Sequence, residues 1–87
     1  MDVMIEVDIF KALADPTRLK ILESVENDEK CICEIIPLTG KSQPNVSQHL
    51  KVLKNAGIIE ERKEGTRILI KSTNDKIYQI IKLVKKF

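Results

Sequence analysis

The sequence predicts a mainly helical domain that carries one β-hairpin near its C-terminal end. Apolar residues recur at helical spacing over most of residues 3–55 and again after residue 76, whereas residues 58–72 alternate as strands do. A length of 87 residues leaves room for one domain, and no internal repeat or Pro/Gly-rich linker divides it. We therefore treat residues 1–87 as a single unit. Its core must be built from Ile, Leu and Val, because aromatic residues make up only 3 % of the chain.

The first two helices are predicted on either side of an Asp-Pro pair. The apolar positions of the first helix are Val3, Val7, Phe10, Leu13 and Ala14. Asp15 then has the character of an N-cap, and Pro16 suits the first position of the second helix. The inward stripe predicted for this second helix is Leu19, Leu22 and Val25. Residues 27–29 are expected to end it.

A short apolar segment, residues 31–38, predicts a third helix that breaks at Pro37. Its predicted inward residues are Ile35 and Ile36. The turn that follows contains Gly40, which is free to adopt a positive φ. We therefore expect a brief helix and a tight turn here.

The fourth helix, residues 43–55, carries the strongest amphipathic pattern in the chain. Ser42 is a favourable N-cap, Pro44 lies in the first turn, and Gly57 follows the helix as a C′ glycine does. At 100° per residue, one face holds the three apolar residues Val46, Leu50 and Leu53. The opposite face carries amides, hydroxyls and ammonium groups. The helix is therefore predicted to bury one stripe and to leave a polar row exposed.

Two strands, residues 58–63 and 67–72, are predicted to form a hairpin whose turn contains Gly65. On the second strand, Ile68 and Ile70 are expected to point to one face of the sheet. The residues expected on the other face are Arg67, Leu69 and Lys71.

The last helix, capped by Thr73 or Asn74, and the first helix carry more apolar residues than one small core can cover. A twofold contact between identical surfaces of two chains would bury the excess apolar residues of both helices. It would also place the two copies of the fourth helix about one DNA turn, roughly 34 Å, apart. The predicted dimer interface comprises Met4, Val7, Phe10, Ile77, Ile80, Ile81, Val84 and Phe87.

The charges are unevenly distributed along the chain. Residues 1–40 hold four basic and nine acidic side chains, a net charge of −5. Residues 41–72 carry a net charge of +4 and residues 73–87 one of +3, so the total of +2 hides an acidic and a basic half. This polarity indicates either a polyanion facing the middle segment or an unevenly charged surface exposed to solvent.

The order of four helices, a basic hairpin and a fifth helix is that of a winged helix-turn-helix. A DNA major groove about 12 Å wide admits one helix, and amide and hydroxyl side chains match the donors and acceptors of base edges. The residues predicted to face the bases from the start of the fourth helix are Ser42, Gln43, Asn45, Ser47 and Gln48. Those predicted to bind phosphates or the flanking backbone are Lys51, Lys54, Arg62, Lys63 and Arg67. Double-stranded DNA is therefore the expected partner.

Several runs of residues resemble the ArsR-type repressors, the arsenic- and metal-sensing family. They are residues 13–22, 42–53, 56–59 and the turn at 64–65, so the resemblance extends over roughly residues 8 to 81. It implies a homodimer joined through the first and last helices. It also implies binding at a palindromic operator and repression that an effector relieves. By position, Gln43, Ser47 and Gln48 match the base-reading residues of that family.

The two cysteines, Cys31 and Cys33, lie too close in sequence for an ordinary loop-closing disulfide, which favours a reducing cytosol. The resemblance implies a thiophilic metal or metalloid ligand pair, because metal-sensing members carry Cys-Val-Cys at this point. The third ligand that such a site needs is missing. Ile36 stands where the arsenic-sensing pattern has a cysteine, and the last helix contains no histidine of the kind that zinc-sensing relatives use. Glu34 is the one neighbouring carboxylate that could complete a mixed site.

Two other interpretations of these cysteines stay open. Both are small apolar residues that could simply pack in the interior. They could also be oxidised to a disulfide, although we expect such a bridge to be strained, with the two side chains directed to opposite faces of a strand.

Other classes of function fit the sequence poorly. No apolar run approaches the roughly 20 residues of a membrane span, and the N-terminal residues lack a signal-peptide pattern, so a cytoplasmic protein is expected. No Ser/His/Asp arrangement or phosphate-binding glycine loop predicts an enzyme, and His49 is expected at the edge of the buried stripe of its helix. The alternative function is a winged-helix protein–protein interaction module, in which the clustered cations would have little functional role.

Overall fold

Two helices joined by a tight corner begin the fold. The computed structural model describes residues 4–87, and Val3 of the predicted first helix lies outside them. Helix α1 (Ile5–Leu13) leads into α2 (Pro16–Ser24). The predicted cap is confirmed, because the Asp15 carboxylate accepts hydrogen bonds from the backbone N–H groups of Thr17 (2.8 Å) and Arg18 (3.1 Å). Pro16 occupies the first helical position.

The buried face of α2 differs from the predicted stripe. Leu22 and Val25 are buried as expected, but Leu19 is partly exposed and Ile21 is completely buried. At 100° per residue, Leu19 lies about 110° from the centre of the stripe formed by Ile21, Leu22 and Val25. The prediction for Leu19 was wrong because α2 is rotated to pack against α3 and α4, which leaves Leu19 facing α5.

A two-residue strand, β1 (Lys30–Cys31), precedes α3 (Ile32–Thr39) and was not predicted. Its residues pair with β3, and a strand this short shows no alternation in the sequence. The predicted break at Pro37 is also wrong, since α3 continues through it. Pro37 lacks one N–H donor, which costs a helix of eight residues a single hydrogen bond. Gly40 ends the helix at φ 68°, as its position predicted.

The remaining elements follow the predicted order: α4 (Gln43–Asn55), β2 (Ile59–Glu64), β3 (Arg67–Ser72) and α5 (Lys76–Lys85). Ser42 caps α4 by accepting the N–H of Asn45 at 3.3 Å. The N-cap position of α5 is held by Asp75 and not by the predicted Thr73 or Asn74, although the Asn74 side chain accepts the N–H of Lys76 at 2.9 Å. Gly57 and Gly65 adopt the positive φ values of 76° and 63° that end α4 and turn the hairpin.

The sheet is antiparallel, with β3 between β1 and β2. Ile70 of β3 is completely buried against the helices. Leu69 lies on the face predicted for it, together with Lys71 and Arg62, but the surrounding side chains bury it. At Leu69 and Ile70, β3 is therefore buried on both faces, which its alternation alone did not indicate.

The hydrophobic core joins all five helices to the sheet. Its completely buried members include Ile21, Leu22, Ile35, Val46, Leu53 and Ile70. The Tyr78 hydroxyl donates a buried hydrogen bond to the carbonyl of Leu22 at 2.7 Å, and burial raises the pKa of Tyr78.

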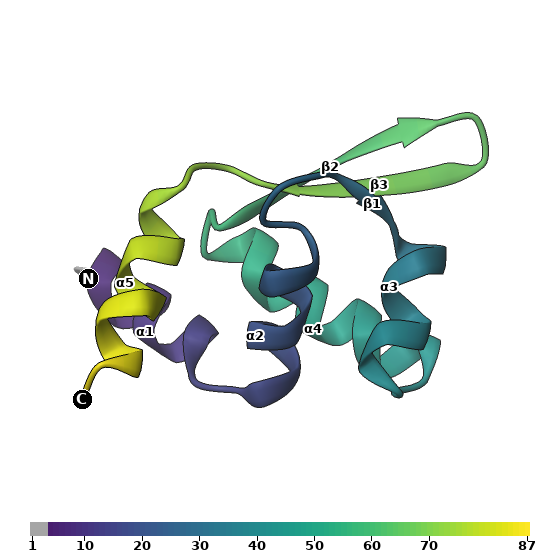
Figure 1. The fold of residues 1–87 in the computed structure, drawn as a ribbon. Helices are drawn as coiled ribbons and strands as arrows, with labels where there is room; N and C mark the ends of the chain where they lie inside the picture. The colour runs from purple at the N-terminus through teal and green to yellow at the C-terminus, as the bar shows by residue number, and fades with distance from the viewer. Residues whose placement is uncertain (1–3) are drawn as a thin grey trace.

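Figure 1 shows α1 and α5 together at the end of the molecule where both termini lie. The β2–β3 hairpin extends over the opposite end, above α3. No helix within residues 4–87 is long and apolar enough to cross a membrane. The fold therefore separates an end built from α1 and α5 from an end built from α3, α4 and the hairpin.

We predict that Ile35→Ala lowers the free energy of unfolding by about 2–5 kcal/mol, because it leaves a cavity at the centre of the core. Leu38→Ala on the same helix is the control, since Leu38 is 50 % exposed and its truncation should cost much less. Urea unfolding at one fixed protein concentration measures both values. Similar losses in the two variants would contradict the assigned core.

Candidate nucleic-acid interface

Helix α4 presents a polar row because its apolar stripe is anchored in the core. Val46, Leu50 and Leu53 are at most 2 % exposed. The predicted DNA-binding residues of this segment are all exposed: Ser42, Gln43, Asn45, Ser47, Gln48, Lys51 and Lys54. The structure therefore brings the amide and hydroxyl side chains together on one free face, preceded by α3 and a turn at Gly40.

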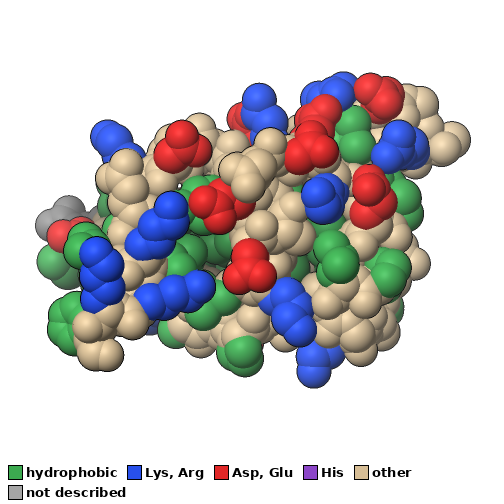
Figure 2. All heavy atoms as spheres, in the orientation of Figure 1, with side chains coloured by type: hydrophobic (Ala, Val, Ile, Leu, Met, Phe, Trp, Pro, Cys, Tyr) green, Lys and Arg blue, Asp and Glu red, His purple; other side chains and the backbone are tan. Residues whose placement is uncertain are grey.

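The hairpin carries the second group of predicted residues. Arg62 lies on β2 and donates to the Glu29 carboxylate through Nε at 3.1 Å and to Glu64 at 3.3 Å. Arg67 begins β3 and lies 3.3 Å from Glu34. Lys63 lies between the two arginines in the sequence, close to the turn, and its side chain is exposed. Figure 2 shows the resulting mixture of acidic and basic side chains on the hairpin.

Carboxylates therefore hold three of the five predicted phosphate-binding cations. Besides Arg62 and Arg67, Lys54 lies 3.0 Å from Glu61. Lys51 and Lys63 form no ion pair within residues 4–87. The hydrogen bond from Arg62 holds the pKa of Glu29 below its usual range, and Glu29 in turn raises the pKa of Arg62. Lys51 and Lys63 are thus the cations most available to a polyanion.

Sequence reasoning did not identify these acidic partners. Arg62 and Glu29 are separated by 33 positions, and so are Arg67 and Glu34. The pairing of β3 with both β1 and β2 brings them together. The one signal in the sequence was the closeness of Glu64 to the predicted turn, which places it beside both arginines.

A hollow connects the hairpin with the start of α4. Its lining includes Gln43 of α4, Arg67 of β3, and both cysteines. One surface therefore holds Gln43, predicted to contact bases, Arg67, predicted to contact the DNA backbone, and the two cysteines. The sequence alone did not indicate this arrangement.

The sulfur atoms of Cys31 and Cys33 lie at disulfide distance, with their Cα atoms 5.1 Å apart. The expectation that a strand would direct them to opposite faces was wrong, because residues two apart in a strand point to the same face. In addition, only Cys31 belongs to β1, and Cys33 already lies in the first turn of α3. The N–H of Cys33 donates to the Cys31 sulfur at 3.1 Å. The pair therefore belongs to a helix N-terminus rather than to a strand.

Glu34 connects this helix start to the hairpin. Its carboxylate accepts the Cys31 N–H at 3.0 Å and also lies 3.3 Å from Arg67. No group of three or more His, Cys, Asp or Glu side chains within residues 4–87 is arranged to hold a metal ion. Within residues 4–87 of one chain, the two sulfur atoms are therefore not part of a complete metal site.

Apolar side chains are exposed at the α1–α5 end. Met4, Phe10, Val84 and Phe87 are each more than half exposed, and Val7 is 39 % exposed. Ile80 and Ile81 are partly buried against the core. Ile77, placed at the interface by the sequence, is instead 7 % exposed, because the first turn of α5 packs into the core.

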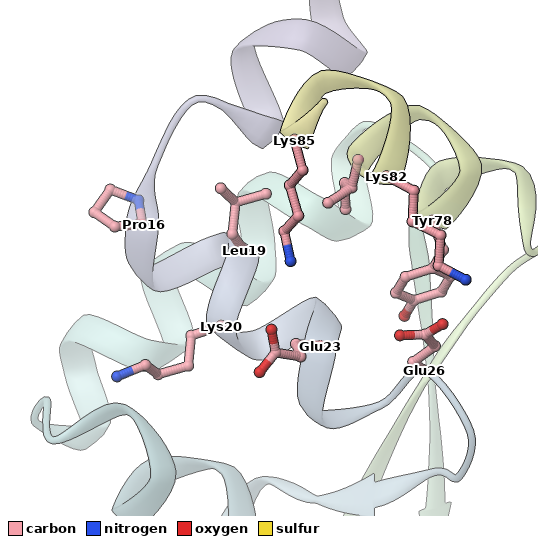
Figure 3. A pocket seen from close by; sticks show the side chains of 9 residues that line it. Pro16, Leu19, Lys20, Glu23, Glu26, Tyr78, Lys82 and Lys85 are labelled. Carbon is pink, nitrogen blue, oxygen red and sulfur yellow. The ribbon is translucent and has the colours of Figure 1, made fainter. Parts of the chain in front are cut away.

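A separate hollow of about 310 Å³ lies between α2 and α5 (Figure 3). Leu19 and Tyr78 contribute to its wall, and Lys82, Lys85 and Glu23 are among the charged side chains around it. None of the predicted DNA-binding residues lines this hollow. It is therefore distinct from the polar face of α4.

Comparisons with known proteins agree with this geometry. Residues 15–61 match the family described as "Bacterial regulatory protein, arsR family". An uncharacterized HTH-type transcriptional regulator of Methanocaldococcus jannaschii is 50 % identical over 78 residues, 88 % of this chain and 88 % of that protein. The arsenical resistance operon repressor of Escherichia coli is 38 % identical over 66 residues, 75 % of this chain and 56 % of the repressor.

Among solved structures, a homodimeric winged helix-turn-helix DNA-binding domain from Mycobacterium bovis superimposes with a TM-score of 0.83 at 31 % identity. The match covers 93 % of this chain and 75 % of that one. It confirms the predicted winged helix-turn-helix fold.

We predict that Glu29→Gln strengthens binding to a random-sequence DNA duplex, because Arg62 then contacts a phosphate without first giving up its carboxylate partner. The slope of log affinity against log salt should change by less than one unit, since Arg62 contacts a phosphate in both proteins. Fluorescence anisotropy across a salt series measures both effects. Glu23→Gln removes the same charge from α2, away from the hairpin, and equal effects of the two variants would argue against the release of Arg62.

Proposed function

This chain belongs to the ArsR family of bacterial regulatory proteins and is a winged helix-turn-helix transcriptional regulator, and we propose that it is a dimeric repressor of a palindromic operator. The observation that carries the proposal is the exposed row of amide and hydroxyl side chains on α4, held outward by a completely buried apolar stripe. A helix of this kind fits the major groove.

In this proposal the N-terminal half of α4 reads bases. The amides of Gln43 and Gln48 each offer a donor and an acceptor, the pattern that an adenine edge complements, and Ser47 and Asn45 extend the same row. Ser42 lies at the end of this row, where its hydroxyl caps the helix. Base recognition is therefore assigned to the residues nearest the turn.

The cations surround that row and bind the DNA backbone. Lys51 and Lys63 meet phosphates directly, whereas Lys54, Arg62 and Arg67 exchange a carboxylate for a phosphate. Exposed ion pairs contribute about 0–1 kcal/mol, so this exchange costs little. A protein–protein interaction module, the alternative function, gives no role to this arrangement of amides and cations.

The dimer forms through α1 and α5, and residues 1–87 act as one domain. The exposed apolar side chains at this end support the contact, since a chain of 87 residues gains stability by covering them. A twofold axis there would place both α4 helices on one side of the dimer, as a palindrome requires. A regulator of this kind acts in the cytoplasm, where the DNA is.

An effector acting at Cys31 and Cys33 is the remaining part of the proposal. Relatives include the arsenical resistance repressor of Escherichia coli and a cadmium resistance regulator of Staphylococcus aureus. Two sulfur atoms suit a thiophilic ion, but Glu34 is engaged by Arg67 and no complete donor set is present in the described chain. We therefore assign no ion, and cadmium and arsenite serve as probes of the pair.

We predict that Gln48→Ala weakens operator binding by about 1–3 kcal/mol and reduces the preference for operator over scrambled duplex, because one base contact is lost. Lys51→Ala should weaken binding to both duplexes and lower the salt slope by about one unit. Anisotropy on DNA from upstream of the protein's own gene, with and without cadmium or arsenite, measures these effects. Unchanged operator affinity in Gln48→Ala would refute the assigned reading face.

We also predict that Val84→Glu converts the dimer to a monomer and abolishes tight operator binding, because it buries a charge in the apolar contact. Gln79→Glu, an exposed position on the same helix, adds the same charge and should leave both properties unchanged. Sedimentation equilibrium at micromolar concentration measures the mass. A monomeric mass for the unmodified chain would contradict the proposed dimer.

A further inference from the structure

The Arg18 side chain connects three helices at the α1–α2 corner. Its Nε donates to the carbonyl of Ala12 at 2.7 Å and its Nη2 to the carbonyl of Lys11 at 3.2 Å. These carbonyls lie in the last turn of α1. That of Lys11 also accepts the N–H of Ala14 at 3.2 Å, whereas that of Ala12 has no helical partner, because Pro16, four residues on, has no N–H to donate. Nη1 of the same guanidinium lies 3.0 Å from Nδ1 of His49, on α4. One cation therefore ties the end of α1 to the middle of α4.

This contact determines which ring nitrogen of His49 carries the proton. A guanidinium has donors and no acceptor, so the hydrogen bond requires an unprotonated Nδ1 that accepts it. The proton of the neutral ring is then on Nε2. Asp15, the cap of α2, lies 3.9 Å from the same Nδ1 and balances the guanidinium charge. In the neutral form of the ring, this contact therefore favours the tautomer with an Nε2–H donor.

The Nε2–H group is free to bind a ligand. Arg18 and Asp15 are the polar partners of the ring within residues 4–87, and both face Nδ1. No buried side-chain nitrogen or oxygen in this part of the chain lacks a hydrogen-bond partner, so Nε2 must be reached by solvent. The His49 side chain is 17 % exposed and follows Gln48 along the edge of the polar row.

We propose that His49 contacts the DNA backbone, with its Nε2–H donating to a phosphate oxygen, and that Arg18 is the positioning residue that fixes this tautomer. The inference rests on the proposed DNA binding and assigns it a further residue. A phosphate fits better than a base, because His49 lies at the edge of the row rather than at its N-terminal end, where bases are read. The same hydrogen bonds join α4 to the end of α1, the helix assigned to the dimer contact.

The tautomer is tested first, in the free protein. The chain contains one histidine, so the ring nitrogens give a single unambiguous pair of signals in a 15N-edited NMR spectrum. Near pH 8 we expect the Nε2–H tautomer to predominate, and Arg18→Gln to shift the signals toward a mixture of tautomers. A predominant Nδ1–H tautomer, or signals indifferent to Arg18→Gln, would overturn the assignment of Arg18.

The phosphate contact is tested with two amide variants that separate the ring nitrogens. In His49→Gln the amide nitrogen can take the place of Nε2, whereas in His49→Asn the amide can replace only Nδ1. On a random-sequence duplex we expect His49→Asn to weaken binding about tenfold and His49→Gln to retain most of the affinity. The salt slope should not change, because a neutral donor releases no counterion, unlike Lys51→Ala.

The outcomes separate this inference from the proposed function. Thermal unfolding of both variants, followed by circular dichroism, establishes that they fold. Full affinity in folded His49→Asn, or equal losses in both variants, overturns the phosphate contact while DNA binding by the unmodified chain stands. A loss confined to the operator duplex overturns it in favour of a base contact. Absence of binding by the unmodified chain to any duplex refutes the proposed function itself.

Discussion

The rotation of α4 about its own axis is the constraint on which the rest of the structure depends. Val46, Leu50 and Leu53 are buried on one side of this helix, and Ile21, Ile35 and Ile70 belong to the same core. Burial of each large aliphatic side chain contributes about 1.5–3 kcal/mol, more than a single exposed polar contact. Packing therefore decides which side chains of α4 face outward, and the amides and hydroxyls are presented as a consequence.

The net charge of each segment does not describe how individual charges are paired in the folded protein. The basic middle of the chain meets the acidic first half in three dimensions, since Glu29 and Glu34 contact Arg62 and Arg67 of the hairpin. These pairs hold the hairpin against β1 and α3 without burying charge. Because such exposed pairs are weak, the same arginines can bind phosphates when DNA approaches. The ion pairs hold the hairpin in place and still leave its arginines available to a polyanion.

One polar contact connects the two ends of the molecule in addition to the core, and a second lies within the end that carries the hairpin. Arg18 joins the last turn of α1 to α4. Glu34 joins the helix start at the cysteine pair to the hairpin. In a dimer built on α1 and α5, the first contact would transmit the geometry of the interface to the recognition surface. The second places the chemistry of the two sulfur atoms next to the hairpin rather than at the dimer contact.

Local sequence determined the helices, caps, turns and hairpin of this protein, because their signals come from residues a few positions apart. Asp15, Ser42 and Gly40 are examples, and the periodicity of α4 predicted both its buried stripe and its polar row. Tertiary structure alone decided the strand β1, the rotation that exposes Leu19, the burial of Ile77 and the carboxylate partners of the arginines. Each depends on residues far apart in the chain: β1 exists because β3 pairs with it, and Arg62 meets Glu29 across 33 positions. Periodicity states which side of a helix is apolar, but only its packed neighbours decide how much of that side is covered.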